Sequence, residues 1–376
     1  MPEAGRYGII GPVDAPKYRT IRDQLKDEIL GGRYGCRNPF PSETALARRF
    51  KTGRSTVKRA LNDLAHLGLI SSQQGRGTFV TKRGASRKIG LIVPGMAYSE
   101  FFPPIVNEIS RLSQLEGYTL LFGAITSKDP GVRAQQARRF AEEFIDEGVS
   151  GVIYQPLEFI SDMTERNREI TGLFTSAGIP VVLACADFVE PPDRSGYDVV
   201  GINNVAAGSL MARHLLSAGA RRVHFLMRPN RGMSVRDRCR GLMATLRESG
   251  GKGVVFSAEP DDVKALRRHL AKGRPEAFVC GSDSDAARFK LMLEAVGLAV
   301  PEDVSLAGFN DVQIASLLSP PLTSVRIPCR EIAMTAFCRL LARIADPDLP
   351  SMECLLPVAL AARASTEKPR KERRRK

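Results

Sequence analysis

The chain has 376 residues, of which 43% are hydrophobic and 26% charged, so it can form two or three globular domains. Its longest apolar runs, such as residues 89–97, are too short to cross a bilayer. The net charge of +14 is uneven: residues 1–88 hold 18 Lys and Arg against 7 Asp and Glu, and residues 367–376 hold 7 against 2. Basic ends on a near-neutral body indicate a terminal module that binds nucleic acid.

The N-terminal residues contain no apolar stretch typical of a secretory signal. The seven cysteines form no C-x-x-C pair, which fits reduced thiols. The four histidines form no H-x₃-H pattern, so a metal site has little support. We therefore expect a cytoplasmic protein that needs no metal and no cofactor.

The first predicted domain covers residues 16–82 and follows an N-terminal extension, residues 1–15. Residues 15–32 place Tyr18, Ile21, Leu25 and Ile29 on one helical face. Residues 40–50 predict a second helix, with Ser42 as a plausible N-cap.

Residues 53–68 predict a third helix with an apolar stripe and a polar front. Arg54, Lys58 and Arg59 lie near its beginning, where unpaired N–H groups already attract anions. A solvated surface helix is the ordinary alternative. A tight turn between two short helices, the second of them cationic, favours a helix-turn-helix.

Residues 69–80 predict a β-hairpin whose tip is Gln74-Gly75-Arg76-Gly77. A hairpin that follows a helix-turn-helix forms a wing. The stretches "FPSETALARRF" (40–50) and "GRSTVKRALNDLAHLGLISSQQGRGTFV" (53–80) resemble the winged-helix domain of the gluconate-repressor (GntR) family.

The resemblance implies that double-stranded DNA is the partner, with Arg54 reading guanine and Lys58 and Arg59 holding phosphates. Four positions depart from the family pattern: Phe40 replaces Leu, Gly53 replaces a capping Ser, Lys58 replaces Arg, and Thr44 stands where relatives often have Arg. The full set of expected DNA-binding residues is Ser42, Thr44, Gly53, Arg54, Ser55, Thr56, Lys58, Arg59, Gln74, Gly75, Arg76 and Gly77.

Residues 83–88 predict a flexible linker, and residues 89–366 predict an α/β body with parallel sheets flanked by helices. Its β-prone runs alternate with amphipathic helical windows. These runs are residues 89–94, 119–124, 151–156, 180–185, 198–202, 223–227, 254–258, 276–281 and 304–309. The length favours two lobes, at about 89–188 and 189–320, with the chain crossing back after 320; residues 367–376 form a basic tail.

The body resembles the sensor of the lactose-repressor (LacI) family, which has the periplasmic-binding-protein type 1 fold. The stretches "VGINNVAAGSLMARHLLSAGARRVHFL" (200–226), "FVCGSDSDAA" (278–287) and "VPEDVSLAGFNDVQIASLLSPPLTSVRIP" (300–328) carry this resemblance. Joined to the winged helix, they resemble arabinose-repressor-like regulators. The combination implies a homodimeric repressor that reads a pseudo-palindromic site.

Loops at the carboxyl ends of the strands supply the candidates for a ligand site. Their polar groups suit a small polar effector such as a carbohydrate, and Arg238 matches the effector arginine of the LacI family. The candidates are Phe101, Phe102, Gln155, Asp187, Asn203, Arg238, Ser282, Asp283 and Asn310, with Asn204 and Asp311 beside two of them. Asp283 has the alternative of a helix cap, and either phenylalanine that of core packing.

Two other functions stay open at this stage. One is a small-molecule-binding protein without a role at DNA, and the other is an enzyme on a doubly wound fold. The sequence holds no G-x-S-x-G elbow and no P-loop, so we expect no catalysis.

Overall fold

The computed structural model describes residues 17–35, 38–73, 76–81, 87–94, 100–127, 129–158, 160, 162–229 and 232–367. The chain divides into two compact units, an N-terminal domain up to Lys88 and a body that contains almost all of the rest. Within the described ranges no helix is long and apolar enough to cross a membrane.

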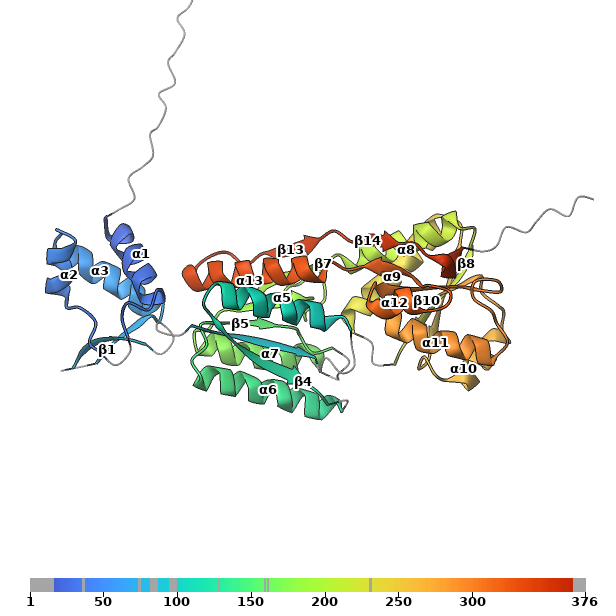
Figure 1. The fold of residues 1–376 in the computed structure, drawn as a ribbon, viewed down its shortest axis with the longest axis horizontal. Coiled ribbons are helices and arrows are strands. Elements are labelled where there is room, and N and C mark those ends of the chain that lie inside the picture. The colour runs from blue at the N-terminus through green and yellow to red at the C-terminus, as the bar shows by residue number, and fades with distance from the viewer. Residues whose placement is uncertain are drawn as a thin grey trace, which may run out of the picture. The chain divides into compact units, whose positions relative to one another are not determined.

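The N-terminal domain consists of helices followed by a β-hairpin (Figure 1). Its described elements are α1 (Lys17–Leu30), α2 (Glu43–Arg49), α3 (Arg54–His66), β1 (Ile70–Gln73) and β2 (Gly77–Val80). The apolar faces of α1 and α3 form one core, in which Leu25, Val57 and Leu64 are fully buried. The strands pair antiparallel, with Ile70 opposite Val80. The predicted winged helix-turn-helix is confirmed.

The first lobe of the body is a sheet covered by helices on both faces. Its strands β3, β5, β6, β7 and β13 run parallel, in the order β13-β7-β6-β5-β3-β4. The helices α5 and α13 lie side by side on one face, and α6 and α7 on the other (Figure 1). The elements are β3 (Lys88–Pro94), α5 (Phe102–Leu115), β4 (Thr119–Ile125), α6 (Pro130–Asp146), β5 (Gly151–Tyr154), α7 (Met163–Ser176), β6 (Val181–Cys185), β7 (Asp198–Ile202), α13 (Cys329–Ala345) and β13 (Glu353–Leu356).

The second lobe repeats this plan with strand order β14-β12-β11-β10-β8-β9. Only β14 among the paired strands described in this sheet runs antiparallel, against β12. The elements are α8 (Asn204–Ser217), β8 (Arg222–Met227), α9 (Met233–Glu248), β9 (Lys252–Ser257), α10 (Val263–Leu270), β10 (Ala277–Cys280), α11 (Asp283–Ala295), β11 (Ser305–Asn310), α12 (Gln313–Leu317), β12 (Thr323–Arg326), β14 (Ala359–Ala361) and the 3₁₀ turn η2 (Ala364–Thr366).

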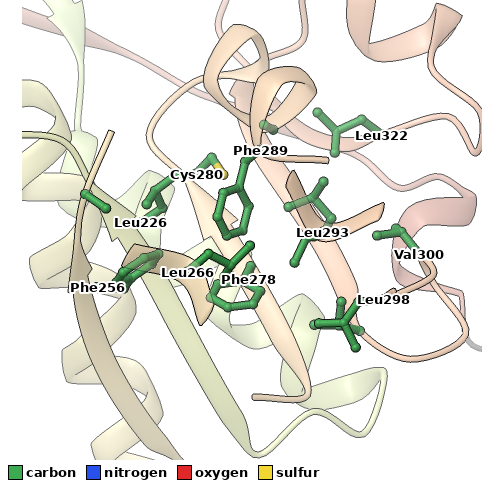
Figure 2. Close-up of a cluster of buried hydrophobic side chains, with 14 of the residues drawn as sticks. Leu226, Phe256, Leu266, Phe278, Cys280, Phe289, Leu293, Leu298, Val300 and Leu322 are labelled. Carbon is green, nitrogen blue, oxygen red and sulfur yellow. The ribbon is translucent and has the colours of Figure 1, made fainter. Parts of the chain in front are cut away.

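The core of the second lobe shows why the apolar runs became central strands. Figure 2 shows Phe278 of β10 and Phe289 of α11 packed against each other, with ring centroids 4.9 Å apart in an edge-to-face arrangement. Phe278 is fully buried, because strands of a parallel sheet have helices on both faces. The two-lobed α/β architecture expected from the sequence is confirmed.

The expected boundary between the lobes is wrong. Strand β7 pairs with β6 in the first sheet, so residues 198–202 belong to the first lobe, and the chain enters the second lobe with α8. The apolar run alone could not reveal this, since β7 is equally buried in either sheet. The chain returns to the first sheet after β12 and leaves it again between β13 and β14.

The returning segment is fixed to the first lobe by a buried carboxylate. Asp198 of β7 is 1% exposed, and its oxygens lie 2.9 Å from Arg339 Nη2 and 2.8 Å from Arg343 Nη2, both on α13. It also accepts a hydrogen bond from Met352 N at 2.9 Å. A buried charge is tolerated only when it is paired and hydrogen-bonded, and these three partners meet that condition.

Candidate functional sites

The exposed face of α3 is cationic and lacks a carboxylate. Arg54, Lys58 and Asn62 are exposed and spaced one helical turn apart, with Ser55 beside them. The acid of this helix, Asp63, lies 3.9 Å from Arg22 Nη1 on α1, away from that face. A polyanion can therefore approach the front of α3 without meeting a like charge.

The two N-caps of the helix-turn-helix differ. The Ser42 hydroxyl accepts a hydrogen bond from Ala45 N at 3.2 Å and so caps α2. Gly53 offers α3 no side-chain cap, so the first N–H groups of α3 have no partner there and suit a phosphate oxygen.

The other residues expected to contact DNA differ in their exposure and in their contacts within the domain. Arg59 is exposed, but its guanidinium carbon lies 4.0 Å from the ring centroid of Tyr18 on α1, which fixes its position. Thr44 and Thr56 are half-buried. At the wing, Arg76 is exposed and Gly77 has φ +104°; Gln74 and Gly75 lie outside the described residues.

One cation of α2 is engaged within the domain. Arg49 Nη1 donates to Glu28 Oε2 at 2.8 Å and to the Tyr34 hydroxyl at 2.9 Å. The hydrogen bonds from Arg49 lower the pKa of Glu28 to about 2. Arg49 thus links α2 to α1. Its position in the sequence alone could not distinguish it from the cations that face solvent.

The body contains a cleft of about 760 Å³ at the carboxyl ends of strands from both sheets. This is the usual position of ligand sites in open α/β sheets, and the volume lies in the usual range for them. Six of the expected ligand residues line it: Phe101, Phe102, Gln155, Arg238, Ser282 and Asn310.

Arg238 of α9 is the most deeply buried cation of the cleft. It is 7% exposed, and its Nε donates to Asn204 Oδ1 at 3.0 Å. Its Nη1 donates to Gly281 O at 2.8 Å and to Asn310 Oδ1 at 3.2 Å. Burial lowers the pKa of Arg238 to about 10, so the guanidinium keeps its charge at neutral pH.

Helix α9 reaches this position because it packs on α8 without side chains between them. A Cβ on Gly241 would lie 1.9 Å from Val205 O, and one on Gly208 would lie 1.9 Å from Arg238 O. Only glycine permits such an approach. The glycine three residues after Arg238 therefore sets the depth at which the arginine enters the cleft.

Two groups in the cleft carry hydrogen-bonding capacity that the described residues do not use. Gln155 is 3% exposed, and its Oε1 is buried without a partner. In the described part of the chain no acceptor is assigned to Arg238 Nη2. Phe101 and Phe102 add apolar faces, with ring centroids 5.1 Å apart in an edge-to-face arrangement.

Two of the lining side chains have further local roles. The Ser282 hydroxyl accepts from Asp285 N at 3.2 Å and caps α11. Asn310 has φ +105°, an unusual conformation that tends to occur at functional sites, and it directs its amide oxygen to Arg238.

The structure does not place Asp187, Asn203 and Asp283 in the cleft, so these three expectations are corrected. Asp187 accepts from the N–H groups of Phe188, Val189 and Ser195, and so folds the loop after β6. Asn203 is the N-cap of α8 and accepts from Ala206 N at 2.9 Å; its neighbour Asn204 lines the cleft instead.

Asp283 is fully buried behind the cleft. It accepts from Ser324 Oγ at 2.7 Å and from Val312 N at 3.0 Å, which ties β12 and the start of α12 to α11. Burial raises its pKa to about 7. Its neighbour Asp311 pairs with Arg326 and Arg363, both at 2.6 Å.

The sequence reasoning missed several charged residues of the cleft: Arg133, Glu158, Arg228, Glu259 and Arg288. Arg228 directly follows β8, and Glu259 lies two residues after the end of β9, so the strand ends were the signal that could have identified them. Arg133 lies inside α6, where nothing in the sequence separates it from surface arginines. Among the described residues, no group of His, Cys, Asp and Glu is arranged to hold a metal ion.

Comparisons with known proteins match both units. Residues 17–80 match the family described as bacterial regulatory proteins, gntR family, and residues 212–366 match the periplasmic binding protein-like domain. The arabinose metabolism transcriptional repressor of Geobacillus stearothermophilus is 28% identical over 337 residues, which cover 85% of this chain and 89% of that protein.

Solved structures agree with these matches. The transcription regulator GntR from Chromobacterium violaceum superposes with a TM-score of 0.60 at 27% identity, covering 74% of this chain and 99% of that one. The transcriptional regulator CelR in complex with cellobiose superposes with a TM-score of 0.64 at 20% identity, covering 87% and 100%; this second likeness concerns the fold.

Proposed function

We propose that this chain, a transcription regulator in which a GntR-family DNA-binding domain precedes a periplasmic-binding-protein-like body, is a repressor controlled by an uncharged polyhydroxy ligand. The ligand binds in the cleft of the body and changes the affinity of the N-terminal domain for its DNA site. The protein acts in the cytoplasm, where its DNA is.

The hydrogen-bonding groups in the cleft that lack a partner among the described residues indicate which class of ligand would bind. Gln155 Oε1 is buried without a donor among the described residues, and Arg238 Nη2 is available to donate to a ligand. A hydroxyl group supplies both a donor and an acceptor, and several hydroxyls on one ring satisfy both groups at once. The rings of Phe101 and Phe102 suit the apolar face of a sugar. CelR, which shares the fold, was solved with cellobiose.

The front of α3 supports the DNA part of the proposal. Arg54 at the helix start suits the O6 and N7 acceptors of guanine in the major groove, and Lys58 one turn on suits a phosphate. Arg76 lies at the wing, where it can reach the neighbouring backbone.

A homodimer completes the proposal, because one winged helix contacts too few base pairs for specificity and a two-fold pair reads a palindrome. Leu115 of α5 is 68% exposed and Met334 of α13 is 40% exposed; since these helices lie side by side, they offer an apolar surface for pairing. Sedimentation velocity on the full chain at micromolar concentration should give the dimer mass. A monomer at that concentration would contradict this part.

The experiment for the function as a whole has two arms. Duplexes that the full chain selects from a random library give the site, and a thermal-shift screen against arabinose, ribose, glucose and cellobiose gives the ligand, since a ligand that binds only the folded state raises the melting temperature. Selection of a sequence together with a melting shift supports the proposal. Uniform binding to all duplexes would contradict it, and so would the absence of any sugar response.

A further inference from the structure

Glu158 of the first lobe binds the beginning of a helix in the second lobe. Its Oε1 accepts from Ser234 N at 3.1 Å and from Ser234 Oγ at 3.0 Å, and its Oε2 lies 3.2 Å from the same hydroxyl. Glu158 follows β5, whereas Ser234 is the second residue of α9. These contacts therefore join the two lobes across the cleft.

Helix α9 lacks a cap of its own. Its N-cap is Gly232, which has no side chain to accept a hydrogen bond, so the first N–H groups and the positive end of the helix dipole need an acceptor from elsewhere. A carboxylate is the most favourable acceptor at this position.

Gly232 also makes room for that carboxylate. A Cβ on Gly232 would lie 2.5 Å from Glu158 Cδ and 2.6 Å from its Oε1, closer than real Cβ atoms come to other atoms. The backbone at Gly232 has φ −72° and ψ 161°, which any residue can adopt. A side chain at position 232 would therefore compete with the Glu158 carboxylate for the same space.

Two more carboxylates of the first lobe contact groups of the second lobe across the cleft. Glu100 Oε2 accepts from Ile314 N at 3.2 Å, at the start of α12, and Glu190 pairs with Arg236 in the first turn of α9. In each of these contacts the first lobe gives the negative charge and the second lobe gives an N–H or a cation. These contacts therefore draw the two lobes toward each other.

We propose that Glu158 is an inter-lobe helix cap that holds the two lobes of the body together and keeps α9, and with it Arg238, in position at the cleft. Glu158 is a positioning residue in this account, because it acts through α9. This role of Glu158 is independent of the proposed control of DNA binding.

Amide hydrogen exchange of the ligand-free full chain tests the cap. As the second residue of α9, Ser234 has an N–H without an intrahelical acceptor, so its protection depends on Glu158. E158A removes the carboxylate. G232A keeps the carboxylate but puts a methyl group into the space that the carboxylate occupies beside Ser234. E259A is the matched control, since Glu259 lines the same cleft but pairs with Arg228 within its own lobe.

We expect Ser234 N–H to exchange more slowly in the wild type than in E158A or G232A, by roughly ten-fold or more, as a charge-assisted hydrogen bond implies. Exchange at Ile314 should rise in both variants too, because opening of the cleft breaks its contact with Glu100. E259A should match the wild type at both amides. Slow exchange over 239–246 in every variant shows that α9 stays folded.

Two results would overturn the proposal. If the wild-type Ser234 amide exchanges as fast as that of E158A, the cap does not form in solution. If both variants speed exchange at Ser234 but leave Ile314 unchanged, Glu158 caps α9 only locally and does not hold the lobes together.

Discussion

Arg54 and Lys58 of α3 are exposed and face no carboxylate of their own helix, whereas Arg238 of α9 is 7% exposed and donates three hydrogen bonds within the second lobe. Exposed cations attract a polyanion over a distance of about a Debye length and lose that attraction in salt. A buried and oriented guanidinium instead recognises a small ligand by direction. Substitutions in the two regions should therefore differ in kind as well as in size.

The largest effect should come from Arg238→Ala. Because a buried hydrogen bond to a charged group contributes about 1.5–3 kcal/mol, we expect a loss of roughly 10- to 100-fold in affinity for the sugar that stabilises the wild type most. Isothermal titration measures it. Arg240→Ala is the matched control, since Arg240 is exposed on the same helix and pairs with Asp237. Equal losses of sugar affinity in the two variants would show that Arg238 has no specific role in binding.

Arg54→Ala should change sequence preference on the DNA side. A bidentate contact to guanine discriminates by about 1–3 kcal/mol at one base pair, so the variant should accept other bases at one position of the selected site and keep the remainder. Selection from a random duplex library, followed by sequencing, shows this. An unchanged site would assign base reading to another residue.

Lys58→Ala should weaken binding to all duplexes alike. Loss of one phosphate contact lowers the slope of log affinity against log salt by about one unit, which fluorescence anisotropy at several salt concentrations measures. Arg49→Ala provides the contrast, because Glu28 and Tyr34 hold Arg49 inside the domain and its loss should leave the slope as it is. The assignment fails if Arg49 moves the slope and Lys58 does not.

The smallest effect concerns the pH dependence of the second lobe. His224 is 6% exposed, and its Nδ1 lies 2.7 Å from His269 Nε2. Burial, followed by the charge of His269, lowers the pKa of His224 to about 4. The unfolded chain takes up the proton near pH 6.5, so the stability that neutral His224 contributes is present above pH 6.5 and is lost as pH falls toward 4.

His224→Phe should remove this loss. The melting temperature of the variant, relative to the wild type, should be higher at pH 5 than at pH 7.5. Asp283, with its pKa raised to about 7, gives the opposite slope in both proteins and cancels in the comparison. His66→Gln, on the exposed surface of α3, serves as the control. A constant difference between wild type and H224F at the two pH values would contradict the prediction.

The exposed cationic face of α3 could be predicted closely because its residues follow one another in the sequence. One helical period places Arg54, Lys58 and Asn62 on the side opposite Val57 and Leu64, as the structure has them. The ion pair between Arg49 and Glu28 could not be predicted, because it depends on how α1 packs against α2.

The cleft was predicted in part because strand ends are visible in a sequence but side-chain directions are not. Gln155 directly follows β5 and Asn310 ends β11, and both line the cleft. Asp283, just after β10, instead turns inward to Ser324 and Val312. Glu158 was missed because its partner at the start of α9 lies 76 residues away, and only folding brings the two lobes together.

The central claim is that the polar cleft and the cationic helix belong to one switch. Anisotropy of the selected duplex, titrated with the full chain in the absence and presence of a saturating stabilising sugar, tests it most directly. We expect the sugar to shift the DNA dissociation constant by roughly 5- to 150-fold, the usual range of allosteric coupling. R238A should bind DNA as the wild type does without sugar, and it should need roughly 10- to 100-fold more sugar for the same shift. Identical dissociation constants for the wild type with and without saturating sugar would contradict this claim.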